Sequence, residues 1–351
     1  MKIAIDVSPL QSGHKIRGVG FYVSYLKKAL LEFYPEHEYV FFEKQSEIPS
    51  SVDIVHYPYF DPFFLTLPLR RGHKTIVTVH DLIPIIFPQN FPAGIKGDLK
   101  WQIQKYNLRT VDAIITNSQT SKKDIVNIVG IPEEKITVTY LAAGEEFKPK
   151  EHAKNELESI KKKYNLPEKF ILYVGDVTWN KNVPILLKAI ENTNIHLVMV
   201  GKSLVAEKVD SSNVWNKSLI ESQQLARANS NVQRLGFLPT EDLIALYNLA
   251  TVFVFPSVYE GFGLPIIEAM QSGCPVITTK GGSLEEVGGD AALYFDGTDS
   301  QALAKVINKV IDSDSLRKEL IAKGLIQAAC FSWQKTAEQT IAVYNEVLKR
   351  K

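Results

Sequence analysis

Short apolar runs alternate with amphipathic helical patterns along almost the whole chain. In the first half, the pattern predicts strands at residues 2–7, 38–42, 53–57, 75–80, 113–117 and 136–140. It predicts helices between them at about 20–33, 96–110 and 118–129. Strands that alternate with helices are typical of a parallel sheet covered by helices on both faces. The first half is therefore predicted to be a doubly wound α/β domain.

The pattern pauses at residues 144–155, where charged residues, Gly144 and Pro149 predict a linker between two domains. It then restarts with predicted strands at 170–174, 196–200, 232–236, 252–255, 275–279 and 293–295. Helices are predicted at 183–192, 217–228, 239–250, 264–272, 300–312 and 314–328. The stretch 332–351 predicts one amphipathic helix capped by Ser332. The second half is thus predicted to repeat the doubly wound α/β pattern.

Composition narrows the possible partners and compartments. A length of 351 residues suits two domains. The net charge of +1 gives no basic field that would favour nucleic acid as a partner. Two isolated thiols, Cys274 and Cys330, suggest neither a disulfide framework nor a zinc site, which favours the cytoplasm. The N-terminus has no signal-peptide pattern, and no stretch approaches the roughly 20 apolar residues of a membrane span.

The most specific local signal is the segment from Glu260 to Glu268, which follows the apolar run 252–256. Two glycines mark the strand exit, and Pro265 lacks an N–H at the predicted helix start. The amides expected to face a phosphate are those of Phe262, Gly263 and Leu264. Ionised carboxylates on either side can accept hydrogen bonds from sugar hydroxyls. The alternative, that a first-turn Glu268 only stabilises its helix through the dipole, leaves Glu260 unexplained.

Three further segments lie at or after the C-terminal ends of predicted strands. Gly18 and Gly20 precede a helix and could bring the backbone close to a phosphate, although an ordinary turn is the alternative. His80 is a candidate hydrogen-bonding or proton-handling group, and a loop histidine satisfied by backbone is the alternative. Lys181 could place a cation on a diphosphate, unless it is a solvated surface lysine.

No Asp-x-Asp pattern follows a predicted strand. The one such spacing, Asp312-Ser313-Asp314, lies between two late helices, where it is expected to cap residue 315 onward. We therefore expect no catalytic metal and no cofactor.

Together these motifs resemble the retaining glycosyltransferases of family 4, the group 1 glycosyl transferases with the GT-B fold. The resemblance covers nearly the whole chain and rests on residues 78–82, 116–118, 256–257, 260–276, 282–287 and 289–292. It implies two Rossmann-like doubly wound domains that face each other across a cleft. Residues 1–150 would form the acceptor-side domain and 151–332 the nucleotide-sugar-binding domain. The terminal helix, 333–351, would cross back to complete the first domain.

The resemblance also implies a role for each candidate residue. Glu268 would hold the ribose hydroxyls of the donor, and Glu260 the hydroxyls of its sugar. Lys181 would stabilise charge on the departing diphosphate, which the amides of Phe262, Gly263 and Leu264 would face. His80 would contact the transferred sugar near the reacting carbon. Leu238 would meet the base through its backbone.

The chain departs from the family pattern at two positions near the diphosphate. Asn180 stands beside Lys181, where the family usually has an arginine. The glycines at Gly18 and Gly20, which would also approach the diphosphate, are followed by Phe21 instead of a frequent arginine. Arg17 is the residue expected to compensate.

The resulting hypothesis is a retaining hexosyltransferase, with mannose favoured, acting in glycan or cell-surface polysaccharide synthesis. GDP-mannose is the favoured donor and a UDP-sugar the alternative. Two rival classes stay open: a non-catalytic nucleotide-sugar-binding subunit, because of the missing arginines, and a nicotinamide-dependent dehydrogenase, which the truncated glycine motif disfavours. The acceptor is expected to be a glycan or a lipid-linked molecule. The apolar stretch 57–71, edged with cations, suggests peripheral contact with the inner face of a membrane, and a packed connection is the alternative.

Overall fold

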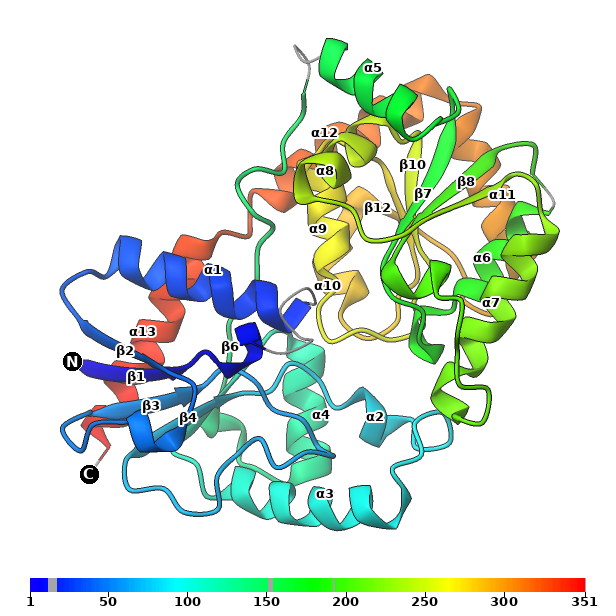
Figure 1. The fold of residues 1–351 in the computed structure, drawn as a ribbon. Coiled ribbons are helices and arrows are strands. Elements are labelled where there is room, and N and C mark those ends of the chain that lie inside the picture. The colour runs from blue at the N-terminus through cyan, green and yellow to red at the C-terminus, as the bar shows by residue number, and fades with distance from the viewer. Residues whose placement is uncertain (12–17, 151–153, 192, 351) are drawn as a thin grey trace. The chain divides into compact units, whose positions relative to one another are not determined.

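The computed structural model describes residues 1–11, 18–150, 154–191 and 193–350. The chain forms two compact units (Figure 1), one of Met1–Ala142 with Phe331–Lys351 and one of Ala143–Cys330. The second unit begins before the predicted boundary at 150 because the preceding residues bond to it. Gly144 accepts a hydrogen bond from the Gln271 side chain at 2.9 Å, and the Lys150 amide donates to Asn248 at 2.6 Å.

The first unit contains a six-stranded sheet in which every neighbouring pair is parallel. Its order is β2-β1-β3-β4-β5-β6. The strands are β1 Lys2–Asp6, β2 Glu38–Phe42, β3 Ile54–Tyr57, β4 Lys74–Thr78, β5 Ala113–Thr116 and β6 Ile136–Val138. The helices are α1 Gly18–Phe33, α2 Ile83–Ile86, α3 Gly94–Arg109, α4 Gln119–Val129 and α13 Trp333–Lys349.

The second unit contains another six-stranded parallel sheet, ordered β12-β11-β10-β7-β8-β9. Its strands are β7 Phe170–Val174, β8 His196–Val200, β9 Val232–Leu235, β10 Val252–Phe255, β11 Val276–Thr278 and β12 Ala292–Tyr294. Its helices are α5 Lys154–Lys163, α6 Val183–Ile190, α7 Lys217–Ala228, α8 Thr240–Leu249, α9 Leu264–Gln271, α10 Leu284–Gly288, α11 Ser300–Ile311 and α12 Asp314–Ala328. The predicted doubly wound architecture is confirmed in both units.

The expected linker, 144–155, ends too late, because Lys154 already begins α5; residues 151–153 lie outside the described part of the chain. The segment 312–314 caps α12 through Ser313, whose hydroxyl accepts from the Leu316 amide, so the helix begins at Asp314, one residue earlier than the capping pattern predicted. Ser332 does cap α13, accepting from the Lys335 amide at 3.2 Å.

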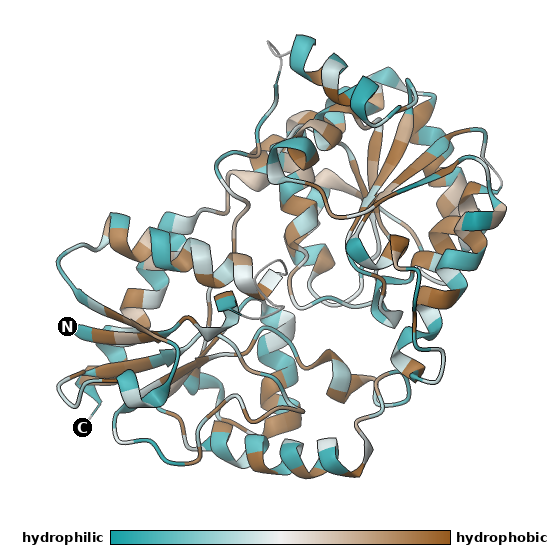
Figure 2. Ribbon diagram, in the orientation of Figure 1, coloured by the Kyte–Doolittle hydropathy of each residue, from teal (hydrophilic) through white to brown (hydrophobic). Residues whose placement is uncertain are grey.

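The core follows from the hydropathy of the strands, which are the most apolar elements in Figure 2. Every residue of β3, β5 and β10 is buried. Burial along a whole strand is expected where helices cover both faces of a parallel sheet. In the first unit α13 packs on α1, with the rings of Tyr25 and Trp333 stacked at 5.1 Å.

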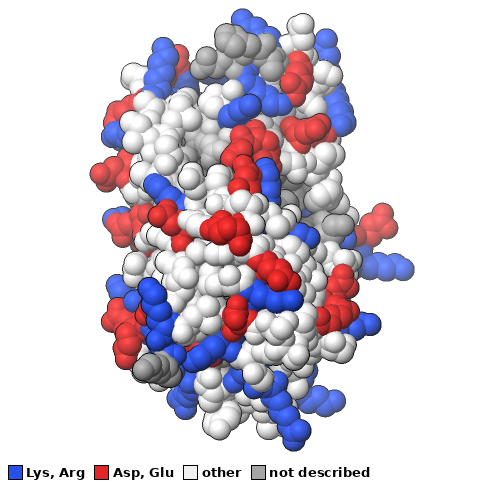
Figure 3. All heavy atoms as spheres, turned by 90° about the vertical axis from the view of Figure 1, so that its left-hand side faces the viewer, with Lys and Arg blue, Asp and Glu red and all other residues white. Residues whose placement is uncertain are grey.

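Acidic and basic side chains are interspersed over the face drawn in Figure 3, as expected for a chain with little net charge.

The order of the second sheet locates a candidate site. The chain runs outward from β7 to β8 and β9, and then returns so that β10 pairs with the other side of β7. Loops that follow two strands at such a reversal diverge and leave a crevice at the carboxyl edge of the sheet. Here these loops are residues 175–182, after β7, and 256–263, after β10.

Candidate functional site

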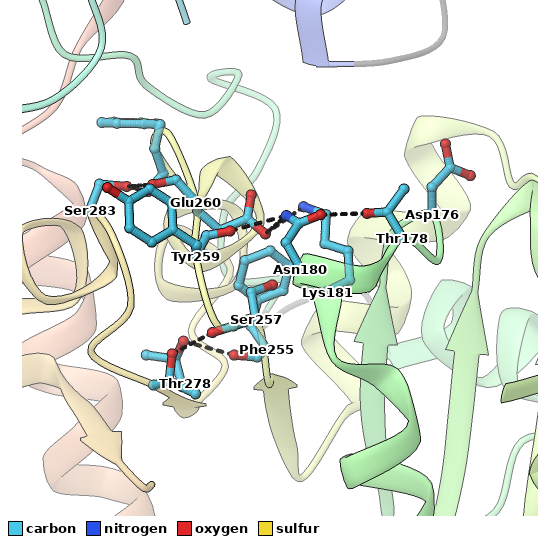
Figure 4. A network of polar contacts seen from close by, with 12 residues as sticks. Asp176, Thr178, Asn180, Lys181, Phe255, Ser257, Tyr259, Glu260, Thr278 and Ser283 are labelled. Carbon is cyan, nitrogen blue, oxygen red and sulfur yellow. Dashed lines mark hydrogen bonds and ion pairs between the residues drawn. The ribbon is translucent and has the colours of Figure 1, made fainter. Parts of the chain in front are cut away.

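Glu260 lies in the loop after β10 and is 8% exposed. Its Oε1 forms an ion pair with Lys181 Nζ at 2.8 Å, which joins the β10 loop to the β7 loop (Figure 4). Lys181 Nζ also lies 4.9 Å from the centre of the Phe255 ring. Its side chain is only 21% exposed, so the interpretation as a solvated surface lysine is wrong. The structure therefore brings together two of the predicted catalytic residues.

Asn180 fixes this pair in place. Its side chain is buried, and its Nδ2 donates to Tyr259 O at 3.0 Å and to Glu260 Oε1 at 3.4 Å. Its Oδ1 accepts from the Thr178 hydroxyl at 2.7 Å, and its carbonyl accepts from the Val258 amide at 2.8 Å. Asn180, treated above only as a lost arginine, is thus a clamp between two loops. A sequence without the fold gives no sign of this role.

A third loop, residues 279–283 after β11, supports the β10 loop from the other side. The Ser283 hydroxyl bonds to Glu260 O at 3.0 Å and to Phe262 O at 2.7 Å. A Cβ atom on Gly281 would lie 1.9 Å from Val258 O. Gly282 has φ +66°, and a Cβ there would lie 2.4 Å from Glu260 O. Only glycines allow the two loops to approach this closely.

This close approach predicts that Gly282→Ala destabilises the second unit. The new methyl group must displace the Glu260 backbone, and alanine itself is disfavoured at positive φ, so we expect a loss of about 2 kcal/mol or more. Thermal unfolding should show a midpoint several degrees lower. Gly72→Ala is the matched control, because a Cβ at Gly72 meets no atom within 4 Å. Equal midpoints for the two variants would contradict the packing argument.

The N-terminus of α9 completes the site. Gly263, at φ +107°, is its N-cap, and Pro265 lies in its first turn. Within the described residues, no hydrogen bond engages the amides of Gly263 and Leu264. Phe262 is buried, and its carbonyl is held by Ser283. The helix therefore offers two amides and the positive end of its dipole to an anion.

Glu268 lies in the second turn of α9, and the assumption that it sits in the first turn is wrong. It is partly buried, and its Oε2 accepts from the Tyr247 hydroxyl at 3.1 Å. Burial raises the pKa of Glu268 to about 7, although the Tyr247 hydrogen bond acts in the opposite direction. Leu238, the residue expected to meet the base, follows β9 and is 9% exposed.

His80 follows β4 in the first unit, and both of its ring nitrogens have partners. Nε2 lies 3.1 Å from Pro58 O, so it donates, and Nδ1 lies 2.7 Å from Asn117 Nδ2, so it accepts. Burial lowers the pKa of His80 to about 4, which keeps the ring neutral at physiological pH. The alternative, a loop histidine whose ring bonds only to backbone, therefore holds for Nε2. It does not hold for Nδ1, whose partner is the side chain of Asn117.

A series of buried side chains joined by hydrogen bonds, which the sequence did not reveal, lies beside His80. Tyr344 of α13 bonds to His56 Nδ1 at 2.7 Å, and His56 Nε2 bonds to the Thr78 hydroxyl at 2.8 Å. Thr78 lies 3.0 Å from the Tyr22 hydroxyl, and the Tyr22 ring meets His80 edge-on at 4.8 Å. This chain ties α13 and α1 to the strand that positions His80.

Gly18 and Gly20 lie in the first turn of α1, so the ordinary-turn alternative is wrong. Gly18 is exposed, Gly20 is buried, and Phe21 is 36% exposed. Arg17, the expected compensating cation, lies outside the described residues.

Over residues 1–11, 18–150, 154–191 and 193–350, no group of three or more His, Cys, Asp and Glu side chains is placed to hold a metal ion. Over the same ranges, no helix combines the length and the apolar character needed to span a bilayer.

Comparison with known proteins relates both halves of the chain to one kind of enzyme. Residues 154–326 match the family described as Glycosyl transferases group 1, and residues 10–142 match Glycosyltransferase Family 4. The chain is 33% identical over 297 residues to the O-antigen chain mannosyltransferase B of Escherichia coli, covering 84% of this chain and 75% of that protein.

One other relative and one solved structure extend the comparison. The chain is 33% identical over 292 residues to the serotype-specific mannosyltransferase WbdA of Escherichia coli. This match covers 82% of the chain but spans only 36% of the length of WbdA. Among solved structures, HepE of Anabaena in complex with UDP-glucose has a TM-score of 0.75 at 17% identity, covering 99% of this chain and all of HepE. The last similarity shows a shared fold.

Proposed function

Because the chain belongs to the group 1 and family 4 glycosyltransferases and has their GT-B fold, we propose that it transfers a hexosyl unit from a nucleotide-diphosphate sugar to an acceptor hydroxyl, with retention of anomeric configuration. The observation that carries the proposal is the Lys181–Glu260 ion pair beside two amides of α9, those of Gly263 and Leu264, that no hydrogen bond engages within the described part of the chain. A cation and helix amides suit a diphosphate, and a carboxylate suits sugar hydroxyls.

The difficult step in such a transfer is departure of the diphosphate from an oxocarbenium-like centre. Lys181 and the amides of Gly263 and Leu264 would stabilise the negative charge that grows on the leaving group, because they are fixed before the reaction begins. When the donor arrives, we expect Lys181 to exchange part of its contact with Glu260 for the diphosphate. Glu260 is then available to the hydroxyls of the sugar.

Retention is proposed to follow from attack on the face that the diphosphate leaves, with a phosphate oxygen taking the proton of the acceptor. Glu260 is assigned to the sugar hydroxyls and stays bonded to Asn180 at 3.4 Å, so this proposal uses no covalent nucleophile. No metal enters this proposal, since Lys181 and the amides supply the positive charge. His80, Gly18 and Gly20 stay predictions for the first unit, and Leu238, Phe262 and Glu268 for the second.

The proposed donor is GDP-mannose, because the relatives matched over most of the chain are named mannosyltransferases. A UDP-sugar is the alternative, supported by the complex of HepE with UDP-glucose. The proposed acceptor is a glycan, free or lipid-linked, in polysaccharide synthesis.

The donor proposal predicts a selective thermal shift. Ligand at about 100 times its Kd adds about 2.7 kcal/mol to the stability of the folded state, which corresponds to several degrees in the unfolding midpoint. GDP and GDP-mannose should give this shift, whereas ADP and NAD should not. If no sugar nucleotide shifts the unfolding midpoint, the proposal is refuted. A shift with NAD alone would instead support the hypothesis that the protein is a nicotinamide-dependent dehydrogenase.

The second candidate is a subunit that binds the donor without turning it over. It is favoured by Asn180, which occupies the place of an arginine as a buried clamp and brings no charge to the diphosphate. Donor binding without hydrolysis and without transfer to any mannan or lipid-linked acceptor would establish it.

We also propose peripheral contact of the first unit with an anionic membrane surface. The stretch 57–71 exposes Phe64 at 63%, Leu65 at 52% and Leu69 at 64%. On α3, whose Gln104 side chain bonds to Phe64 O at 2.6 Å, Ile95, Leu99 and Tyr106 are also exposed. Apolar side chains among lysines are typical of interfacial surfaces. Absence of co-sedimentation with anionic liposomes at low salt would exclude this contact.

A further inference from the structure

A cavity of about 200 Å³ lies in the first unit beside β3 and β4, and the proposed transfer does not use it. Val55 and Ile48 form its apolar part. Its polar lining includes Arg70, Arg71 and Tyr57. Among the described residues, those that line it include two arginines and no carboxylate, which gives the lining a positive charge. The volume is below the roughly 300–1,000 Å³ of pockets for drug-sized ligands, which limits the ligand to a small group.

The two arginines differ in how they are held. Arg71 is partly buried, donates to Pro68 O at 3.3 Å, and also bonds to the Thr110 hydroxyl. Arg70 is exposed, and within the described residues no hydrogen bond or ion pair engages its guanidinium. Asp112, the acid whose charge acts on Arg71, is paired with Lys74 at 3.2 Å. Arg70 therefore supplies a cationic donor with no carboxylate partner among the described residues, whereas the Arg71 guanidinium already bonds to Pro68 and Thr110.

Tyr57 adds a neutral donor. It is 4% exposed, and its oxygen accepts from Gln45 Nε2 at 3.4 Å. Its own O–H has no acceptor among the described residues. Burial raises the pKa of Tyr57, so the hydroxyl keeps its proton at physiological pH. The guanidinium of Arg70 and the buried hydroxyl of Tyr57, both on residues that line the cavity, are the kinds of donor that bind the oxygens of a phosphate.

We propose that this cavity binds a phosphate group, as a phosphomonoester or a diphosphate. The group could belong to a soluble compound or to the head of a lipid, whose chain the neighbouring Leu69 would accommodate, since this leucine is 64% exposed. The site is independent of the proposed transferase activity, because it uses neither the β10 loop nor α9.

The test uses inorganic pyrophosphate and a readout confined to the cavity. Methyl NMR signals of Ile48 and Val55, which line it, should shift saturably on titration of the full chain. Arg70→Gln should weaken this binding about tenfold or more, because a charge-assisted hydrogen bond is lost. Lys123→Gln, the same charge change at an exposed position on α4, should leave it unchanged. Tyr57→Phe, which removes only the hydroxyl, should weaken it less than Arg70→Gln.

Vesicles then distinguish the two sources of phosphate. If the ligand is a lipid, vesicles containing phosphatidic acid should bind in competition with pyrophosphate and depend on Arg70, whereas phosphatidylcholine vesicles should not bind. Pyrophosphate binding without such competition assigns the site to a soluble phosphate. Methyl signals that stay fixed at millimolar pyrophosphate, or equal weakening by Arg70→Gln and Lys123→Gln, would overturn the proposal. Donor binding at the β10 loop is measured separately, so neither result decides the other.

Discussion

Lys181→Ala is expected to lower kcat by roughly 10²–10³, because one preorganised donor to a developing oxyanion has about this effect. The KM for the donor should change less, since the cation matters most when the diphosphate departs. Steady-state transfer from the sugar nucleotide identified by thermal shift measures both constants. Lys188→Ala is the matched control, because Lys188 pairs with Glu221 at 3.0 Å on the surface, away from the loop.

The ion pair with Glu260 offers a way to separate chemistry from folding. Removing Lys181 alone leaves a buried carboxylate without its cation, so the single variant should also be less stable. Adding Glu260→Gln removes the unpaired charge and should restore much of the unfolding midpoint. The rate should stay low in the double variant. Because Glu260 is itself proposed to hold the sugar, the rate is compared with that of Glu260→Gln alone. Equal rates for Glu260→Gln and the double variant would show that Lys181 only supports the loop.

Glu268→Gln is expected to weaken donor binding by roughly 10- to 100-fold, the effect of losing charge-assisted hydrogen bonds to hydroxyls. Calorimetric titration with the nucleoside diphosphate measures this loss. Glu319→Gln on α12, where Glu319 is an exposed acid paired with Lys323, should leave Kd unchanged. A variant with unchanged affinity would exclude Glu268 from the donor site.

The same variant should be more stable than the wild type at alkaline pH. Burial raises the pKa of Glu268 from its ordinary value of 4.5 to about 7, so the unfolded chain loses this proton first as pH rises. The wild type therefore loses stability between about pH 4.5 and 7, and the loss persists above pH 7. Glu268→Gln has no such titration, and the difference between the two unfolding midpoints should grow over this range and then level off.

Donor binding should release a proton near pH 7. Hydroxyls that donate to the Glu268 carboxylate favour its ionised form and lower its pKa in the complex. Binding heats measured in buffers of different ionisation enthalpy should reveal the release in the wild type and its absence in Glu268→Gln. Uptake of a proton instead would mean that the ligand contacts the protonated acid.

Both sheets were predictable because parallel strands are buried on both faces and stand out as apolar runs. Val252–Phe255 was predicted to the residue, and strand ends such as Asp6 and Thr78 differ from the prediction by one or two residues. The polar helix α5 was missed, since it buries none of its residues and resembles a linker in composition.

The position of a candidate site residue was predictable where it depends on residue type next to a strand end. Glu260 and Lys181 were predicted separately, and the structure adds their contact at 2.8 Å. The roles of Asn180 and Ser283 were not predictable, because they depend on loops that lie about 80 and 20 residues away from their partners in the chain. The series of hydrogen-bonded side chains from Tyr344 to Tyr22 was also missed, because its members are far apart in the sequence.

The seating of Val258 and Glu260 against the glycines at 281 and 282 has a consequence for engineering donor preference. If the segment equivalent to Glu260–Glu268 were taken from another enzyme, it would lack the loops that hold it in its own protein. Asn180 and the residues from Gly281 to Ser283 would have to be moved with it as one cassette. Chimaeras that exchange the segment alone should misfold locally, whereas three-loop exchanges should yield working hybrids.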